Sequence, residues 1–86
     1  MEKKYSYRTK GTCSRQIDFT LDDDVIVDAR FIGGCSGNTQ GVAALVRGMK
    51  VQEAIERLKG IRCGSKSTSC PDQLATALIK AINENK

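Results

Sequence analysis

The stretch QIDFTLDDDVIVDARFI, residues 16–32, decides the fold of this chain. Apolar and polar residues alternate along its first six positions, which is typical of a strand with one buried face. The three aspartates at 22–24 predict a turn, because aspartate favours turns and adjacent carboxylates resist burial. A second strand follows over residues 25–32, so the stretch predicts an antiparallel hairpin. The residues expected to face the core are Ile17, Phe19, Leu21, Val25, Val27, Ala29 and Phe31.

The segment upstream predicts a further strand beside this hairpin. Tyr5 and Tyr7 alternate with Ser6 and Arg8, so the two rings share one face. Three strands joined by short turns make an antiparallel meander.

Three helices are predicted downstream, because the apolar period changes from two to about 3.6 residues. Asn38 is a good N-cap for the first helix, in which Gly41 lowers stability or permits close approach of another backbone. The second helix ends at Gly60. The third has Cys70 as its N-cap and Pro71 as its first helical residue. The three apolar stripes comprise Val42, Leu45, Val46 and Met49, then Val51, Ile55 and Leu58, then Leu74, Ala75, Leu78, Ile79 and Ile82.

The order β-β-β-α-α-α predicts an α+β fold, with a three-stranded antiparallel sheet and three helices packed on one face. The length of 86 residues suits one domain, residues 1–86. A domain of this size has a thin core, so an internal cross-link would stabilise it. No apolar run approaches the ~20 residues of a membrane span, and the N-terminal residues lack the apolar stretch of a signal peptide. We therefore expect a cytoplasmic protein without membrane contact.

The composition excludes several kinds of site. The chain has no histidine, which excludes Cys–His nucleophile pairs, histidine general bases and zinc sites with imidazole ligands. The net charge is +4, and the aromatic residues are two tyrosines and two phenylalanines. Because the basic residues are spread along the chain and offer no stacking platform, we do not expect nucleic acid as a partner.

Four cysteines carry the remaining chemistry: Cys13, Cys35, Cys63 and Cys70. Each lies at the end of an expected element, away from the apolar stripes. Cys35 and Cys70 stand at expected helix N-termini, where the helix dipole favours the thiolate that binds metals. We therefore predict that the four thiolates hold one metal ion and that no residue is catalytic.

Three interpretations of the cysteines remain open at this point. Reduced cytosolic thiols favour metal binding or redox chemistry over structural disulfides. Four thiolates around one ion are typical of structural zinc, with an iron–sulfur cluster as the alternative. A closed zinc site leaves no position for a water nucleophile, so it would be structural. Alternatively, Cys63 and Cys70 form a reversible redox dithiol, or the four thiols are unrelated.

Two further features have weaker functional interpretations. Residues 33–38, GGCSGN, open a helix and could hold an anion on backbone N–H groups, although the dinucleotide and phosphate-loop patterns are absent. Residues 65–69 are more typical of a polar turn, and Asp72 suits the positive end of a helix dipole.

The run Thr68-Ser69-Cys70-Pro71-Asp72 spells the name of a known domain. With GGCSGN upstream and GIRCG at 60–64, the chain resembles a stand-alone TSCPD-domain protein over nearly its whole length. The same domain lies at the C-terminus of adenosylcobalamin-dependent (class II) ribonucleotide reductases, where metal binding has been inferred from its cysteines. The resemblance implies an accessory module with a ribonucleotide reductase or another protein as partner. It does not imply reductase activity, because 86 residues cannot build the barrel that shelters a thiyl radical.

The chain also resembles, more distantly, the NifU/IscU-like iron–sulfur scaffold proteins. The similarity lies in residues 28–31, 34–36 and 48–54, and in Ser69-Cys70 followed by Leu74-Ala75. It implies that Cys13, Cys35 and Cys70 occupy the ligand positions of that family.

Two departures from the scaffold family bear on the metal. Arg15 stands where that family has an aspartate, and Ser69 stands where it often has a histidine. With Cys63 as a fourth thiolate, these departures favour a tight zinc site over cluster transfer. Asp28 and Arg15 are then expected to orient the ligands without binding the metal.

Overall fold

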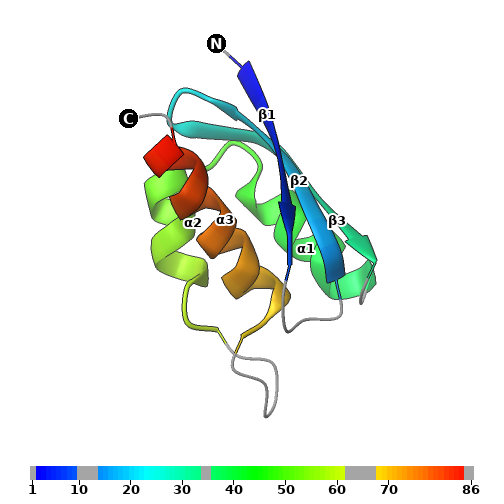
Figure 1. Cartoon of the computed structure of the whole chain (residues 1–86). Coiled ribbons are helices and arrows are strands. Elements are labelled where there is room, and N and C mark those ends of the chain that lie inside the picture. The colour runs from blue at the N-terminus through cyan, green and yellow to red at the C-terminus, as the bar shows by residue number, and fades with distance from the viewer. Residues whose placement is uncertain (1, 10–13, 34–35, 62–67, 85–86) are drawn as a thin grey trace.

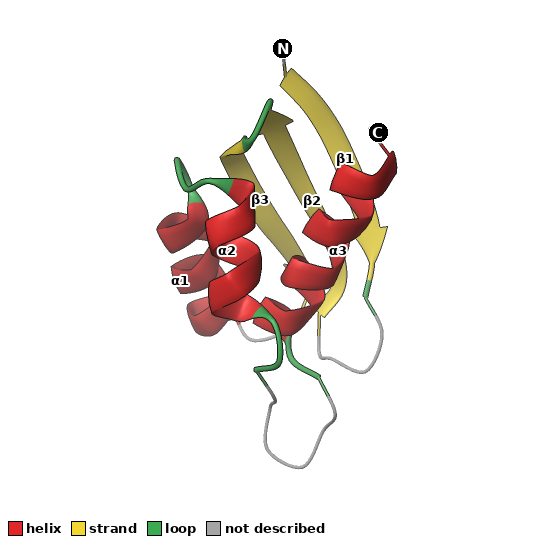
Figure 2. Ribbon diagram, turned by 90° about the vertical axis from the view of Figure 1, so that its left-hand side faces the viewer, coloured by secondary structure: helices red, strands yellow, loops and turns green. Residues whose placement is uncertain are grey.

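The chain folds into a three-stranded antiparallel sheet followed by three helices, which confirms the predicted α+β class and element order. The computed structural model describes residues 2–9, 14–33, 36–61 and 68–84. The strands are β1 (Glu2–Arg8), β2 (Ser14–Asp22) and β3 (Val25–Gly33), in that order across the sheet. The helices are α1 (Ser36–Val46), α2 (Val51–Leu58) and α3 (Cys70–Glu84). All three helices cover the same face of the sheet (Figures 1 and 2).

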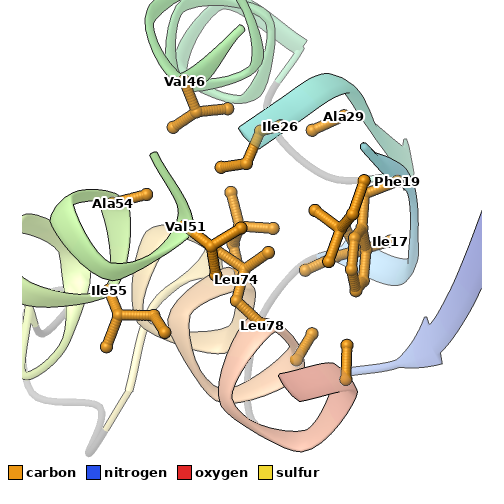
Figure 3. Close-up of a cluster of buried hydrophobic side chains, with 13 residues drawn as sticks. Ile17, Phe19, Ile26, Ala29, Val46, Val51, Ala54, Ile55, Leu74 and Leu78 are labelled. Carbon is orange, nitrogen blue, oxygen red and sulfur yellow. The ribbon is translucent and has the colours of Figure 1, made fainter. Parts of the chain in front are cut away.

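The core lies between the sheet and the helices (Figure 3). Ile17 from β2 and Leu74 and Leu78 from α3 are completely buried, and each contributes roughly 1.5–3 kcal/mol of burial free energy. Tyr5 extends the cluster to β1, because its ring stacks on Phe19 with centroids 5.2 Å apart. The predicted inner face of the first two strands is therefore confirmed.

β3 contains a bulge that the alternating pattern did not indicate. The β2–β3 register shifts between Thr20 and Leu21, which leaves Val27 as the extra residue. The extra residue reverses the alternation, so Ile26 is completely buried while Val25 and Val27 are partly buried. The prediction that these two valines define the inner face is wrong. Beyond the bulge, the predicted core residues do pack against the helices.

α1 differs from its prediction at both ends. It begins before Asn38, which lies inside the helix and is not its N-cap. It ends at Val46, so Met49 lies beyond it. Val46 is 2% exposed, whereas Leu45 is 75% exposed. The prediction for Leu45 is wrong because the buried stripe of α1 passes through Thr39, two turns before Val46.

Gly41 does not serve close packing. A Cβ atom built on Gly41 would have no atom within 4 Å apart from its chain neighbours and the backbone of its own helix. Of the two predicted roles, only the loss of helix stability therefore remains.

The predictions for α2 and α3 are largely confirmed. Val51 and Ile55 are buried, and Gly60 has a φ of +84°, as expected for the residue that stops a helix. Ile79 is 40% exposed, so its predicted place on the apolar face is wrong. Among the described residues, no helix has the length and apolar character required to cross a membrane. The buried residues of α3 are Cys70, Gln73, Leu74, Ala75, Ala77, Leu78 and Ala81.

The turn between β2 and β3 packs against the connection from α1 to α2. Asp23 has a φ of +54°, which aspartate tolerates better than most residues, and the predicted turn is confirmed. Ile26 donates its N–H to the Met49 carbonyl at 2.9 Å and accepts from the Gly48 N–H at 2.7 Å. The Val51 N–H donates to the Asp24 carbonyl at 2.7 Å. These bonds cover the outer edge of β3 where that strand begins.

Candidate functional site

Several element ends meet at one end of the molecule. The end of β1, the start of β2, the end of β3, the end of α2 and the start of α3 lie there together (Figures 1 and 2). We call it the cysteine end, because Cys70 lies in it and the connections that carry Cys13, Cys35 and Cys63 leave from it. It is opposite the β2–β3 turn.

On the sheet side of the cysteine end, Ser14 of β2 pairs with Gly33 of β3. The register shifts directly after this pair and leaves Arg15 as an extra residue, whose carbonyl accepts from the Thr9 N–H at 3.2 Å. Gly33 has a φ of +81°, and a Cβ atom there would lie 3.3 Å from Arg15 Nε. Glycine is therefore favoured by the backbone conformation, and a larger residue would also require the Arg15 side chain to shift slightly.

On the helix side, α3 is capped by Ser69 and not by Cys70. The Ser69 carbonyl accepts from the Gln73 N–H at 2.8 Å, which is the first helical hydrogen bond. Ser69 Oγ accepts from the Asp72 N–H at 3.2 Å and donates to the Ile61 carbonyl at 2.6 Å. The prediction of Cys70 as the N-cap is wrong, because Cys70 is the first helical residue and the proline follows it.

The Asp72 carboxylate ties together the two segments that flank residues 62–67. Its Oδ1 accepts from the Gly60 N–H at 2.6 Å, and its Oδ2 accepts from the Thr68 hydroxyl. Thr68 Oγ1 in turn accepts from Gln73 Nε2 at 3.1 Å. With the bond from Ser69 to Ile61, these contacts form a network that we call the loop clamp. It comprises Gly60, Ile61, Thr68, Ser69, Asp72 and Gln73.

Three of the six residues of the loop clamp are buried. Thr68, Ser69 and Gln73 are 9%, 4% and 8% exposed. Throughout the described residues, every buried side-chain nitrogen and oxygen has a hydrogen-bond partner. Because an unsatisfied buried polar group costs about 1–3 kcal/mol, removing one member of the clamp penalises the partners left behind. The clamp therefore fixes how α2 ends relative to the start of α3.

The sequence does not predict the clamp. Its pattern predicts a polar turn at residues 65–69 and a dipole interaction for Asp72, and it indicates no role for Gln73. One signal was present, because Ser69 and Asp72 have the S-x-x-D spacing of a capping box. The bonds to Gly60 and Ile61 have no local signal, because they depend on how α2 and α3 pack together.

Of the four predicted metal ligands, the structure describes Cys70, which is buried and 9% exposed. Cys13, Cys35 and Cys63 lie outside the described residues, as does the centre of the predicted anion-binding segment 33–38. Within residues 2–9, 14–33, 36–61 and 68–84, no three His, Cys, Asp or Glu side chains form a metal-binding group. The four-thiolate site and the Cys63–Cys70 dithiol therefore both stay predictions.

The two residues predicted to orient the ligands lie in different places. Arg15 is at the cysteine end, beside Gly33. Asp28 pairs with Thr20 in mid-sheet, five residues from Gly33, which is about 17 Å along the strand. It lines an open concavity of about 630 Å³. Arg15 therefore lies at the cysteine end and Asp28 lies away from it, and the predicted orienting role of both residues stays a prediction.

These features define a small α+β domain in which the strand and helix ends that flank the cysteine-bearing connections lie at one end, beside a clamped helix start. The family model of the TSCPD domain matches residues 2–82, and the chain belongs to this family. Three residues of the signature run, Thr68, Ser69 and Asp72, make up half of the loop clamp. No match was found among curated proteins or among solved structures. The likeness to NifU/IscU-like scaffolds and the link to class II reductases stay predictions.

Proposed function

We propose that this TSCPD domain is a non-catalytic accessory module that holds one zinc ion through the thiolates of Cys13, Cys35, Cys63 and Cys70. The observation that carries the proposal is the meeting of element ends at the cysteine end. Three connections that each contain a cysteine leave from it, and the fourth cysteine is buried in it.

Two fixed contacts support the convergence of the sulfur atoms. Cys13 directly precedes Ser14 and Cys35 follows Gly33 by two residues, and Ser14 is paired with Gly33. Two cysteines therefore adjoin one cross-strand pair, whose Cα atoms lie about 5 Å apart.

The loop clamp supplies the second contact. Cys63 follows Ile61 by two residues and Cys70 directly follows Ser69, and these partners share a hydrogen bond of 2.6 Å. The Asp72 carboxylate reinforces the same contact through Gly60. Each pair of cysteines thus borders a contact that is made between protein atoms.

The donor set fits zinc. Four thiolates without histidine are the ligands of closed, tetrahedral structural sites. Such a site contributes to folding free energy, which a chain of 86 residues with a thin core needs. The family context suggests that the folded module serves a partner protein, with a ribonucleotide reductase as the first candidate.

Metal analysis of protein purified without a histidine tag tests the proposal. We expect about one zinc per chain and four thiols that react only after a chelator or denaturant is added. Each of the variants Cys13→Ser, Cys35→Ser, Cys63→Ser and Cys70→Ser should lower zinc content and expose the remaining thiols. The matched control is Ala75→Ser, which adds a hydroxyl at another buried position of α3 and should keep its zinc.

Three results would overturn the zinc site. A brown protein with visible absorbance after anaerobic purification would replace zinc by an iron–sulfur cluster. Two reactive thiols without metal would favour the Cys63–Cys70 dithiol. Four reactive thiols in a folded, metal-free protein would leave the cysteines unrelated.

A further inference from the structure

The outer edge of β1 is a surface that the proposed metal site does not use. β1 stands first in the sheet order, and within the described sheet it pairs only with β2. The opposite edge, where β3 begins, is bonded to the α1–α2 connection through Ile26. Because an open strand edge is a template for pairing with another chain, the two edges differ in what they can bind. Figure 2 shows β1 at the margin of the sheet, with α3 beside it.

A small cavity of about 60 Å³ lies between β1 and α3. Tyrosine, phenylalanine and alanine side chains line it together with one serine of β1 and with one lysine and one glutamate from the helix. Its lining residues are Tyr5, Ser6, Tyr7, Phe19, Ala77, Lys80, Ala81 and Glu84.

We propose that β1 pairs antiparallel with β1 of a second copy of this chain, around a two-fold axis at Tyr5. Antiparallel strands related by a two-fold axis face each other with the same set of pairs in both directions. With Tyr5 opposite Tyr5, Glu2 faces Arg8 of the second copy and Arg8 faces its Glu2. Lys3 faces Tyr7 and Lys4 faces Ser6.

The charges of β1 select this register. Side-chain alternation first excludes a register displaced by one residue. That register would pair Tyr5 with Lys4 and put the two sets of helices on opposite faces of the joined sheet. Among the registers displaced by two residues, charge decides. An axis at Lys4 would set Lys4 against itself, and an axis at Ser6 would set Lys4 against Arg8. Like charges directly opposite are destabilising. The axis at Tyr5 combines two opposite-charge pairs with no like-charge pair.

The aromatic rings on the helix-covered face of the sheet also favour a two-fold axis at Tyr5. Tyr5 already stacks on Phe19, with ring centroids 5.2 Å apart. A second Tyr5 alongside extends this stack to a row of four aromatic rings across a six-stranded sheet. The two-fold axis also sets the two α3 helices antiparallel.

Sedimentation velocity over a concentration series tests the pairing. We expect a monomer–dimer equilibrium in the wild-type chain and a dissociation constant raised at least ~10-fold by Glu2→Arg or by Arg8→Glu, because each change creates two like-charge contacts. The double variant Glu2→Arg/Arg8→Glu restores opposite charges in the same register and should return the dissociation constant to within about 3-fold of the wild type. Both positions are exposed, so the variants should keep their circular dichroism spectrum.

A second surface provides the matched control. Leu45 on α1 is 75% exposed and far from β1 in sequence, and Leu45→Lys should leave the dissociation constant unchanged. A folded wild-type chain that stays monomeric at about 1 mM would overturn the proposal. So would a dimer that tolerates Glu2→Arg, a double variant that is not rescued, or a dimer lost on Leu45→Lys.

Discussion

The neighbouring segments at the two ends of the molecule are joined by different kinds of hydrogen bond. At the turn end, the β2–β3 turn and the α1–α2 connection are joined by backbone hydrogen bonds, at 2.9 Å from Ile26 to Met49 and 2.7 Å from Val51 to Asp24. At the cysteine end, the end of α2 is joined to the start of α3 by the side chains of Ser69 and Asp72, at 2.6 Å to Ile61 and Gly60. The turn end is thus joined through backbone atoms, whereas the cysteine end is joined through side-chain oxygens that bond to backbone atoms.

This difference determines what each end requires of its residues. Every residue except proline offers a backbone N–H and carbonyl, so a backbone contact tolerates most substitutions. A side-chain contact depends on one hydroxyl or one carboxylate. The geometry of the cysteine end therefore depends on the identities of Ser69 and Asp72. A site made of residues from several connections needs such specific contacts to hold those connections in place. The TSCPD run supplies that geometry as well as a thiol.

Matched aspartate substitutions at the two ends give the largest expected difference. Asp72→Ala removes the acceptor of the Gly60 N–H and of the Thr68 hydroxyl. Because Thr68 is buried, we expect the free energy of unfolding to fall by about 2 kcal/mol. Urea denaturation followed by circular dichroism measures the change.

The control for this prediction is Asp24→Ala at the turn end. The Asp24 side chain is exposed, and its contact with Val51 uses the carbonyl, which alanine retains. We expect a change within about 0.5 kcal/mol. Equal losses at the two ends would refute the distinction between side-chain and backbone closure.

The fold was predictable from sequence because each element carries its own period. The alternation of Ile17, Phe19 and Leu21 and the helical spacing of Leu74 and Leu78 both survive in the core. The β3 face was not predictable in full, because the bulge at Val27 inserts one residue into the alternation. A bulge depends on pairing with β2, which a single strand does not reveal.

The candidate site was predictable only in its parts. The placement of Cys70 at the start of a helix is confirmed, since α3 begins there. Its neighbour Ser69 is the cap, which the S-x-x-D spacing to Asp72 indicates. The contacts to Gly60 and Ile61 join two helices across residues 62–67. No local pattern encodes them, because both helices must pack before those atoms meet.

Two glycine-to-alanine substitutions should change the free energy of unfolding in opposite directions. Gly33→Ala at the cysteine end places a methyl group at a φ of +81° and 3.3 Å from Arg15 Nε. We expect a loss of about 1 kcal/mol from backbone strain. Gly41→Ala lies in open space within α1 and should instead add roughly 0.5–1 kcal/mol.

Thermal unfolding measures both glycine variants. For a domain of this size, 1 kcal/mol corresponds to a shift in Tm of about 4–8 °C. We expect Tm to fall for Gly33→Ala and to rise for Gly41→Ala. Two shifts of the same sign would mean that the conformation of Gly33 does not constrain the end of β3.

The smallest expected effect lies between the two ends, at Asp18 in the middle of β2. Its Oδ1 accepts hydrogen bonds from Gln16 Nε2 at 2.8 Å and from Ser6 Oγ at 2.7 Å. These bonds, the one from Gln16 first, hold the pKa of the carboxyl below its ordinary value, and the charge of Arg30 adds to them. A lowered pKa means that folding favours the charged form. Asp18 therefore contributes stability above its ordinary pKa, and this contribution disappears as the pH falls through the lowered value.

Asp18→Asn tests this contribution, which is below about 1 kcal/mol because the site is open to solvent. The difference in unfolding free energy between wild type and variant should shrink as the pH falls from about 6 to about 2. Carbon-detected NMR titration of the Asp18 carboxyl gives the direct measurement. Its pKa should rise in Gln16→Ala, and by less in Ser6→Ala, because Gln16 is the larger cause. A larger rise in Ser6→Ala would contradict this order. It would mean that Ser6 of β1, and not Gln16 of the same strand, is the main cause of the lowered Asp18 pKa.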